Sequence, residues 1–266
     1  MRTVLLPFAL FFFGINPVAF AGINGEQVKP AGINQYLSRT VSSSDISITK
    51  YQLLTEAGKT VGFRGGKAER SFEIQDVLER KSPTLDRLYD FRILISNQGW
   101  LPPVIDEAID VAHISSDQIR TANKVYEILQ PARFVSNPPS WRRWLLIGLS
   151  SIPEIGPESD VLTENSEQKR VWKNAVRQGW LEGRESADFI LEANFNRLTR
   201  DYKGMLIYSQ LLRQGFITAP IVSDQQQTVS GDKQKLTTGE RLRKLKQPAE
   251  FVTDKTKWRP VILSEK

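Results

Sequence analysis

Two long stretches of the chain carry apolar residues at the spacing of a helix. In the first, small and apolar residues recur every three or four positions, so they share one face. This stretch predicts a helix that begins near Ser44-Asp45, where either residue can cap the first turn, and that ends or kinks at Ser82-Pro83. The residues of the shared face are Leu54, Ala57, Val61, Gly65, Ala68 and Phe72.

The second stretch has the stronger helical pattern. Asn165 can cap it, with Gln168 three residues later as in a capping box, and Gly215 can close it. About 45 residues at 1.5 Å each would span roughly 65–70 Å if unbroken. The stripe on its buried face consists of Trp172, Val176, Trp180, Gly183, Ala187, Ile190, Asn194, Leu198, Tyr202 and Met205.

Glycines interrupt both helical patterns. Each glycine inside a helix costs about 1 kcal/mol relative to alanine, so a compensating reason is expected. For the first helix, close approach of another backbone is the favoured reason, and for the second we expect a bend. The glycines are Gly58, Gly62, Gly65 and Gly66 in the first stretch, and Gly179, Gly183 and Gly204 in the second.

A phosphate-binding loop is excluded at the two Gly-Lys pairs. Such a loop needs a glycine five residues before its Gly-Lys. That position is Leu53 for Gly58-Lys59 and Val61 for Gly66-Lys67.

Between the helices, the segment Gly99–Leu146 alternates in the manner of β-strands. Pro102-Pro103 sets an extended entry, and Val104–Ala112 and Ile119–Leu129 flank a turn at Ser115-Ser116-Asp117. This predicts an antiparallel pair, to which Phe134-Val135 could add a third strand. The chain is therefore expected to be α+β, mainly α-helical with small antiparallel β-sheets, with two long helices flanking a central β unit.

A second β region follows the second helix. Ala219–Val222 opens it, Ser230-Gly231-Asp232 is a turn signal, and Leu236–Lys246 can return as a strand. The chain then reaches Trp258–Ile262, which is expected to be extended.

The Gly99–Leu146 segment ends in Trp141-Arg142-Arg143-Trp144. Tryptophan and arginine dominate the energetic centres of protein interfaces, so Trp141, Arg142, Arg143 and Trp144 form the candidate partner interface. In the alternative, both tryptophans belong to the core and the arginines extend to water. The sequence leaves the two interpretations open.

The N-terminal residues predict an exported protein. Arg2 precedes an apolar run from Val4 to Ile15, and Ala19-Phe20-Ala21 is a cleavage pattern with Ala21 and Gly22 at the cut. The apolar run of about 12 residues is shorter than the roughly 20 that a membrane-spanning helix needs. Residues 1–21 are thus expected to be a signal peptide, residues 22–44 a flexible linker, and residues 45–266 a single domain.

Charge and composition exclude several classes of site. The chain has no cysteine, so disulfides, thiolate nucleophiles and thioether lipid anchors are ruled out. The net charge is +6, and ten basic against five acidic side chains lie in residues 232–266. The run Arg241–Lys246 predicts either an electrostatic contact with an acidic partner, anionic lipid or nucleic acid, or a solvated face, which is commoner for so short a run.

No arrangement of residues predicts catalysis, and no catalytic, cofactor-binding or metal-binding residue is assigned. His113 is the only histidine, too few for a zinc site. Asp106 and Glu107 are neighbours on a strand and point to opposite faces, and Asp110 reads as solvated charge. Two alternatives remain: a cell-envelope hydrolase that uses Glu107 or Glu182 as its acid, or a peptidoglycan- or glycan-binding protein that uses Trp141 and Trp144.

Several short segments from about residue 50 onward add a family resemblance. In their order and spacing, the chain resembles the DotC/TraI family of type IVB secretion and conjugative transfer systems. The segments are Thr55–Arg70, Leu85–Phe91, Trp100–Val104, Tyr126–Val135, Pro138–Arg142, Gln178–Gly183, Leu198–Met205, Ala219-Pro220 and Trp258–Val261.

The resemblance implies a non-enzymatic subunit of the outer-membrane core complex, in the periplasm at the inner face of the outer membrane. It further implies multiple copies in a ring, DotD-like and DotH-like partners, no cofactor and no direct binding of nucleic acid. Family members carry a lipoprotein cysteine after the leader, which this chain lacks. Its association with the outer membrane is therefore expected to depend on partners.

Overall fold

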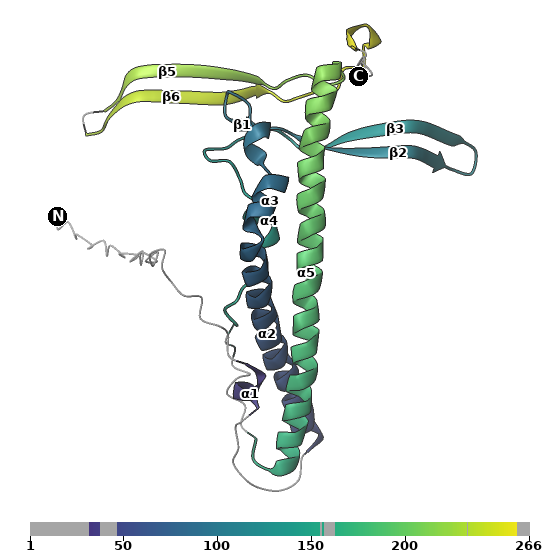
Figure 1. Ribbon diagram of the computed structural model, residues 1–266, viewed down its shortest axis with the longest axis vertical. Helices are drawn as coiled ribbons and strands as arrows, with labels where there is room; N and C mark the ends of the chain where they lie inside the picture. Colours follow the sequence, from purple (N-terminus) through teal and green to yellow (C-terminus); the bar gives the residue numbers. More distant parts are fainter. Residues whose placement is uncertain (1–31, 38–46, 155, 157–162, 233, 260–266) are drawn as a thin grey trace, which may run out of the picture.

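The computed structural model describes residues 32–37, 47–154, 156, 163–232 and 234–259. Two long helices, α2 (Ile48–Arg80) and α5 (Ser166–Gln214), lie side by side along the long axis and form a stalk (Figure 1). They run in the same direction, since Gly58 faces Trp172 and Gly66 faces Trp180. Because the two helices are parallel, the chain between them must run back along the stalk before α5 begins. The loop around Leu149 starts this return, and the side chain of Gln75 on α2 donates a 2.6 Å hydrogen bond to the carbonyl of Leu149.

The glycines of α2 meet the backbone of α5, as predicted. A Cβ atom added at Gly62 or Gly66 would lie under 3.0 Å from a carbonyl oxygen of α5, Val176 or Trp180 respectively. The contact is reciprocal, because a Cβ at Gly179 or Gly183 would meet carbonyl oxygens of α2 in the same way. We call these glycines, Gly62, Gly66, Gly179 and Gly183, the glycine seam.

The prediction of a bend at the glycines of α5 is wrong. The helix continues from Ser166 to Gln214, so Gly179 and Gly183 serve close packing instead. Gly204 has the same role, since a Cβ there would lie 2.6 Å from the carbonyl oxygen of Ile105.

The ends of both helices follow their local sequence. Ser47 caps α2 by accepting a 3.3 Å hydrogen bond from the amide of Lys50, three residues later than the predicted start at Ser44. Asn165 caps α5 through a 2.7 Å bond from the amide of Gln168, as predicted. Gly215 ends α5 at φ +75, a conformation that glycine adopts without strain.

Part of the predicted linker is ordered. Residues Ile33–Tyr36 form a short helix, α1, beside the stalk. The ring of Tyr36 lies 5.8 Å from the ring of Trp180, and its carbonyl accepts a 3.0 Å hydrogen bond from the indole N–H of Trp172. These contacts place α1 against Trp172 and Trp180 of the stalk. The predicted signal peptide and the other parts of the predicted linker lie outside the described residues.

One end of the stalk carries several short elements, which together we call the head. They are α3 (Ser82–Leu88), η1 (Phe91–Leu94), β1 (Trp100–Leu101), β4 (Arg133–Phe134) and α4 (Arg142–Leu145). β4 pairs with β1 and not with the neighbouring hairpin, so the third strand predicted at Phe134-Val135 belongs to a separate two-stranded sheet.

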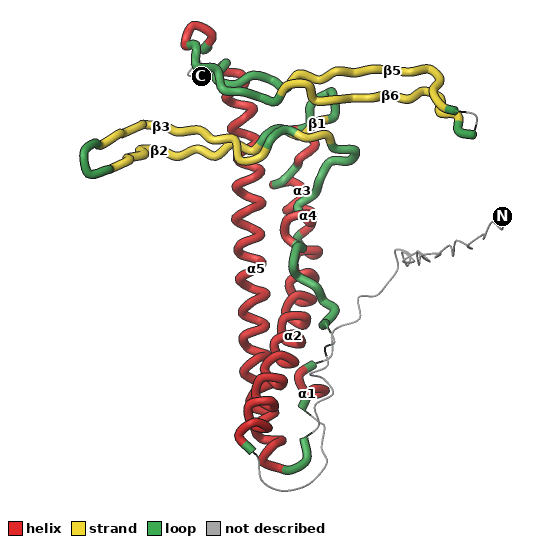
Figure 2. Tube along the Cα trace, turned by 180° about the vertical axis from the view of Figure 1, so that it is seen from behind, coloured by secondary structure: helices red, strands yellow, loops and turns green. Residues whose placement is uncertain are grey.

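Two long β-hairpins leave the head end in opposite directions (Figures 1 and 2). The first joins β2 (Val104–Ile114) to β3 (Ile119–Gln130), and the second joins β5 (Ile221–Gly231) to β6 (Leu236–Gln247). We call them the first arm and the second arm. Both are antiparallel, as predicted.

After the second arm the chain forms η3 (Lys255–Lys257), and Trp258 packs on Phe216 with ring centroids 4.5 Å apart. The last part of the expected extended end lies beyond the described residues. The α+β prediction, mainly helical with small antiparallel sheets, is confirmed. The helices flank the β unit in sequence, but in space they pack on each other and the arms project beyond them.

Candidate functional site

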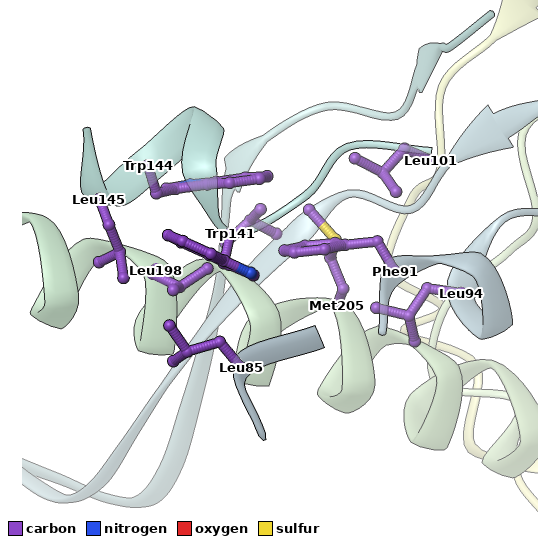
Figure 3. Packing of buried hydrophobic residues seen from close by; sticks show 10 residues of the cluster. Leu85, Phe91, Leu94, Leu101, Trp141, Trp144, Leu145, Leu198 and Met205 are labelled. Carbon is purple, nitrogen blue, oxygen red and sulfur yellow. The ribbon is translucent and has the colours of Figure 1, made fainter. Parts of the chain in front are cut away.

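Both tryptophans of the candidate interface lie in the hydrophobic core of the head (Figure 3). Trp141 is 0% exposed and Trp144 is 5% exposed. The indole ring of Trp144 stacks on Phe91, with centroids 4.7 Å apart and planes 3° from parallel. The surrounding side chains come from α3, η1, β1, α4 and α5, and include Leu85, Leu101, Leu145, Leu198 and Met205.

The polar atoms of the same segment are used inside the molecule. The indole N–H of Trp141 donates a 2.8 Å hydrogen bond to Asp86, and the guanidinium of Arg142 lies 4.3 Å above the Trp141 ring. Arg142 also donates to Glu79, and the ion pair lowers the pKa of that carboxyl group. The core interpretation therefore holds for Trp141 and Trp144, and as partner anchors they are a wrong prediction. Of the four residues, only Arg143 is exposed.

The two glutamates of the alternative hydrolase prediction do not have the environment of a catalytic acid. Glu107 accepts hydrogen bonds from Lys124 at 2.7 Å and Tyr126 at 3.0 Å. The ammonium group lowers the pKa of Glu107, whereas a general acid needs a raised one. Glu182 has a side chain 50% exposed, 4.0 Å from Lys59, and accepts a 3.0 Å bond from Gln178.

The described part of the chain offers no metal site, and the two tryptophans of the glycan-binding alternative are buried in its core. No group of three or more His, Asp or Glu side chains there could hold a metal ion. His113 is exposed on β2, opposite Arg120. A cavity of about 680 Å³ lies between α2 and the loop around Leu149, lined among others by Lys59 and Lys67 but by no tryptophan.

The first arm has one face that combines carboxylates with exposed apolar side chains. Cross-strand partners share a face, and so do residues two apart along a strand. Asp106 lies opposite Glu127, and Ala108 lies opposite Val125. Toward the tip, Ile114 pairs with Ile119 on this face, and the two are 72% and 68% exposed. We call this surface the acidic face.

The side chains of Asp106 and Glu127 make no ion pair or hydrogen bond with any described residue, although they lie directly opposite each other. Like charges in this position destabilise a hairpin. On the opposite face of the same arm, Lys124 pairs with Glu107. The acidic face thus holds charge that its own molecule leaves uncompensated.

The second arm has a corresponding face of opposite charge. Leu242, Lys244 and Lys246 alternate along β6 and lie on the face that also carries Glu240 of β6 and Gln225 and Val229 of β5. Leu242 is 57% exposed and Val229 is 61% exposed. Neither lysine makes an ion pair among the described residues. We call this surface the basic face.

The other face of the second arm has its charges paired. Asp224 binds Arg241 at 2.9 Å and lies 3.5 Å from Arg243. Arg243 also donates a 3.0 Å hydrogen bond to the carbonyl of Gln98 in the head. The pair lowers the pKa of Asp224, mainly through the hydrogen bond from Arg241. This face therefore holds the base of the arm in place and leaves the basic face open.

Over the whole of each arm, residues 104–130 hold five acidic and two basic side chains, and residues 221–247 hold three acidic and six basic ones. The charge of the Arg241–Lys246 run is visible in the sequence. Because side chains of a strand alternate between its two faces, Arg241 and Arg243, which pair with Asp224, lie on one face, and Lys244 and Lys246 lie on the other. What the sequence pattern did not reveal is that the two arms project away from the body and from each other. The arrangement offers two surfaces for other molecules.

No helix within the described residues is both long and apolar enough to cross a membrane. A search of curated proteins finds no match to the chain. A family model described as "Type IV secretory system, conjugal DNA-protein transfer" matches residues 49–260, which include the stalk, the head and both arms. The chain therefore belongs to this family of type IV secretory system components for conjugal DNA-protein transfer.

Proposed function

We propose that the protein is a non-enzymatic structural subunit of a type IVB secretion or conjugal transfer apparatus, and that it helps to assemble or localise the outer-membrane core complex. The observation that carries this proposal is the pair of exposed arms at one end of the two-helix stalk. Their apolar and unpaired charged side chains are surfaces for binding other subunits, whereas the carboxylates considered for catalysis are exposed or paired with lysine.

In this proposal the protein acts in the periplasm at the inner face of the outer membrane, in several copies, beside DotD-like and DotH-like subunits. Because the chain has no cysteine for a lipid anchor, it is held at the membrane through these partners. The proposal includes no direct binding of nucleic acid, whether the cargo is DNA or protein.

Fractionation of the native host tests the proposal. The expected result is that the protein co-sediments with outer membranes when the DotD-like and DotH-like subunits are present, shifts to the soluble periplasmic fraction when they are deleted, and co-purifies with them after mild detergent extraction. Secretion or transfer should fail in a deletion strain, while Glu107→Gln and Glu182→Gln variants should retain it. A cytoplasmic protein that co-purifies with no envelope subunit would contradict the proposal.

A further inference from the structure

Each arm is a two-stranded sheet. Its acidic or basic face also carries exposed apolar side chains. An isolated two-stranded hairpin in water is marginally stable, and a second layer over its apolar face stabilises it. Val125, Ile114 and Ile119 are 42%, 72% and 68% exposed on the acidic face, and nothing in the described chain covers them. Both arms therefore lack the second layer that two-layer sheet packing normally supplies.

The two arms of one molecule cannot supply this layer to each other. They leave the head in opposite directions, and no contact between them places the acidic face on the basic face (Figures 1 and 2). A covering sheet must come from another molecule. The first arm has strands of 11 and 12 residues, and so does the second. At about 3.3–3.4 Å per residue, the two arms match in length, about 36–41 Å.

We propose that the acidic face of the first arm packs on the basic face of the second arm of another copy of this chain. The inference rests on the proposed function only in requiring several copies. Charge complementarity selects this occupant: among the described residues, the carboxylates of Asp106 and Glu127 have no cationic partner, and the ammonium groups of Lys244 and Lys246 have no anionic partner. Packing two first arms or two second arms together would instead place like charges against each other.

The contact follows from the geometry of the two molecules. Arms of two copies that point the same way, base beside base, bring Asp106 and Glu127 near Lys244 and Lys246. The apolar tip pair Ile114 and Ile119 then lies near Val229 and Leu236 toward the tip of the second arm, which are 61% and 73% exposed. A copy turned by half a turn about the stalk axis places its second arm along the first arm of the other copy in this way, and its first arm along the second arm of the other copy. The contact therefore forms twice about a two-fold axis.

Cysteine cross-linking tests the faces directly, because the chain has no cysteine of its own. Mature full-length Ala108→Cys and Gln225→Cys proteins place a thiol on the acidic and the basic face, respectively. Mixed and treated with a short bismaleimide, they should give a cross-linked heterodimer. The matched control uses Ile109→Cys and Gln226→Cys, exposed neighbours on the opposite faces. The expected yield for the first pair is severalfold above the control, and equal yields would overturn the proposal.

A charge exchange gives the second test. Asp106→Lys with Glu127→Lys, and separately Lys244→Glu with Lys246→Glu, should each abolish self-association measured by sedimentation velocity at low salt. Mixing the two reversed proteins should restore association, because every contact between unlike variants is again of opposite charge. Restoration also shows that both variants are folded. Failure of the mixture to associate would refute the arm contact.

The outcome is separable from the proposed function. If wild-type protein co-purifies with the envelope subunits but the reversed variants assemble like wild type, the arm contact is wrong and the structural role stands. If the arms cross-link between copies in a protein that never associates with the apparatus, the contact stands and the proposed function fails.

Discussion

The indole N–H of Trp144 donates a 2.9 Å hydrogen bond to the carboxylate of Asp201, which is 3% exposed. The same carboxylate accepts hydrogen bonds from Arg200 at 2.9 Å and 3.1 Å. This pair ties α4, and through it the head, to α5. The same contacts explain why Trp144 faces inward. Its ring stacks on Phe91, and its indole N–H, the one polar group of the side chain, donates to the buried carboxylate of Asp201.

We expect Trp144→Phe to lower the free energy of unfolding by about 2 kcal/mol, the range for losing a hydrogen bond to a charged group. Phenylalanine keeps an aromatic ring against Phe91 but leaves one buried oxygen of Asp201 with only the long, 3.5 Å hydrogen bond from Gln130. Urea denaturation followed by circular dichroism measures the change. Trp258→Phe is the control, because Trp258 is 37% exposed and donates to a backbone carbonyl near the surface. Equal losses in the two variants would contradict the role of Asp201.

The glycine seam predicts a larger effect from a smaller change. Gly62→Ala places a methyl group under 3.0 Å from the Val176 carbonyl, so the two helix backbones must move apart. Overpacking typically costs about 1–3 kcal/mol and sometimes more, and a backbone atom cannot yield as a side chain does. We expect a loss of about 3 kcal/mol or more, measured by urea denaturation.

Gly179→Ala tests the same seam from the other helix. It should lower the free energy of unfolding by about as much as Gly62→Ala, since its methyl group would meet the carbonyl oxygen of Lys59. Gly32→Ala is the matched control, because nothing lies within 4 Å of a Cβ at that position. If Gly62→Ala raises stability, as alanine does in an exposed helix, the close packing of α2 and α5 is refuted.

The local elements of this fold are readable in the sequence because each depends on near neighbours. Helical spacing predicts α2 and α5, alternation predicts both arms, and Asn165 and Gly215 mark helix ends. The glycines of α2 also predict a close backbone partner. The sequence does not predict that Gly179 and Gly183 of α5 are this partner, because their contact depends on which faces of two helices far apart in the sequence meet.

The sequence does not predict whether the tryptophans face the core or the solvent, because this too depends on residues far away in the sequence. Trp141 and Trp144 are covered by Phe91 and Met205, which lie far away in the sequence. The pairing of β4 with β1 likewise joins Trp100 to Phe134 across the whole first arm. The charge of the candidate arm surfaces is visible in the sequence, but their exposure depends on how the head directs the two hairpins.

Acid should weaken the stalk through Glu73. Hydrogen bonds from Arg184 and Arg70 lower the pKa of this carboxyl group, with Arg184 the larger cause. A carboxyl group with a lowered pKa in the folded state contributes stability above its unfolded pKa, which is lost as pH falls through the folded value. Unfolding free energy should therefore decrease as pH falls below about 4.5, the ordinary value for glutamate.

Glu73→Gln should be less stable than wild type at neutral pH, and the difference should shrink as the pH is lowered. Denaturant titrations at several pH values measure both trends. Asp76→Asn is the control. Among the described residues, Asp76 pairs with Arg80 alone, one turn away on the same helix, and both side chains are more than half exposed. A constant difference between Glu73→Gln and wild type at all pH values would contradict the assigned ion pair.

Tyr208 should oppose stability at high pH. Its side chain is 2% exposed, and its hydroxyl has no hydrogen-bond partner among the described residues. Burial raises the pKa of Tyr208 to about 12, from 10.0 for a free tyrosine. The unfolded chain therefore releases this proton first, and folding stability falls as pH rises from about 10 toward about 12.

Tyr208→Phe removes the hydroxyl and keeps the ring that packs edge-on against Trp100, with centroids 6.2 Å apart. Because the hydroxyl is buried without a partner, its removal should leave stability at pH 7 unchanged or raise it by about 1 kcal/mol. Above pH 10 the variant should lose less stability than wild type, as measured by denaturant titration. Tyr51→Phe, at a position 51% exposed, should change neither value. A marked destabilisation by Tyr208→Phe at pH 7 would mean that the hydroxyl has a partner in solution, because only a lost hydrogen bond separates the two side chains at this site.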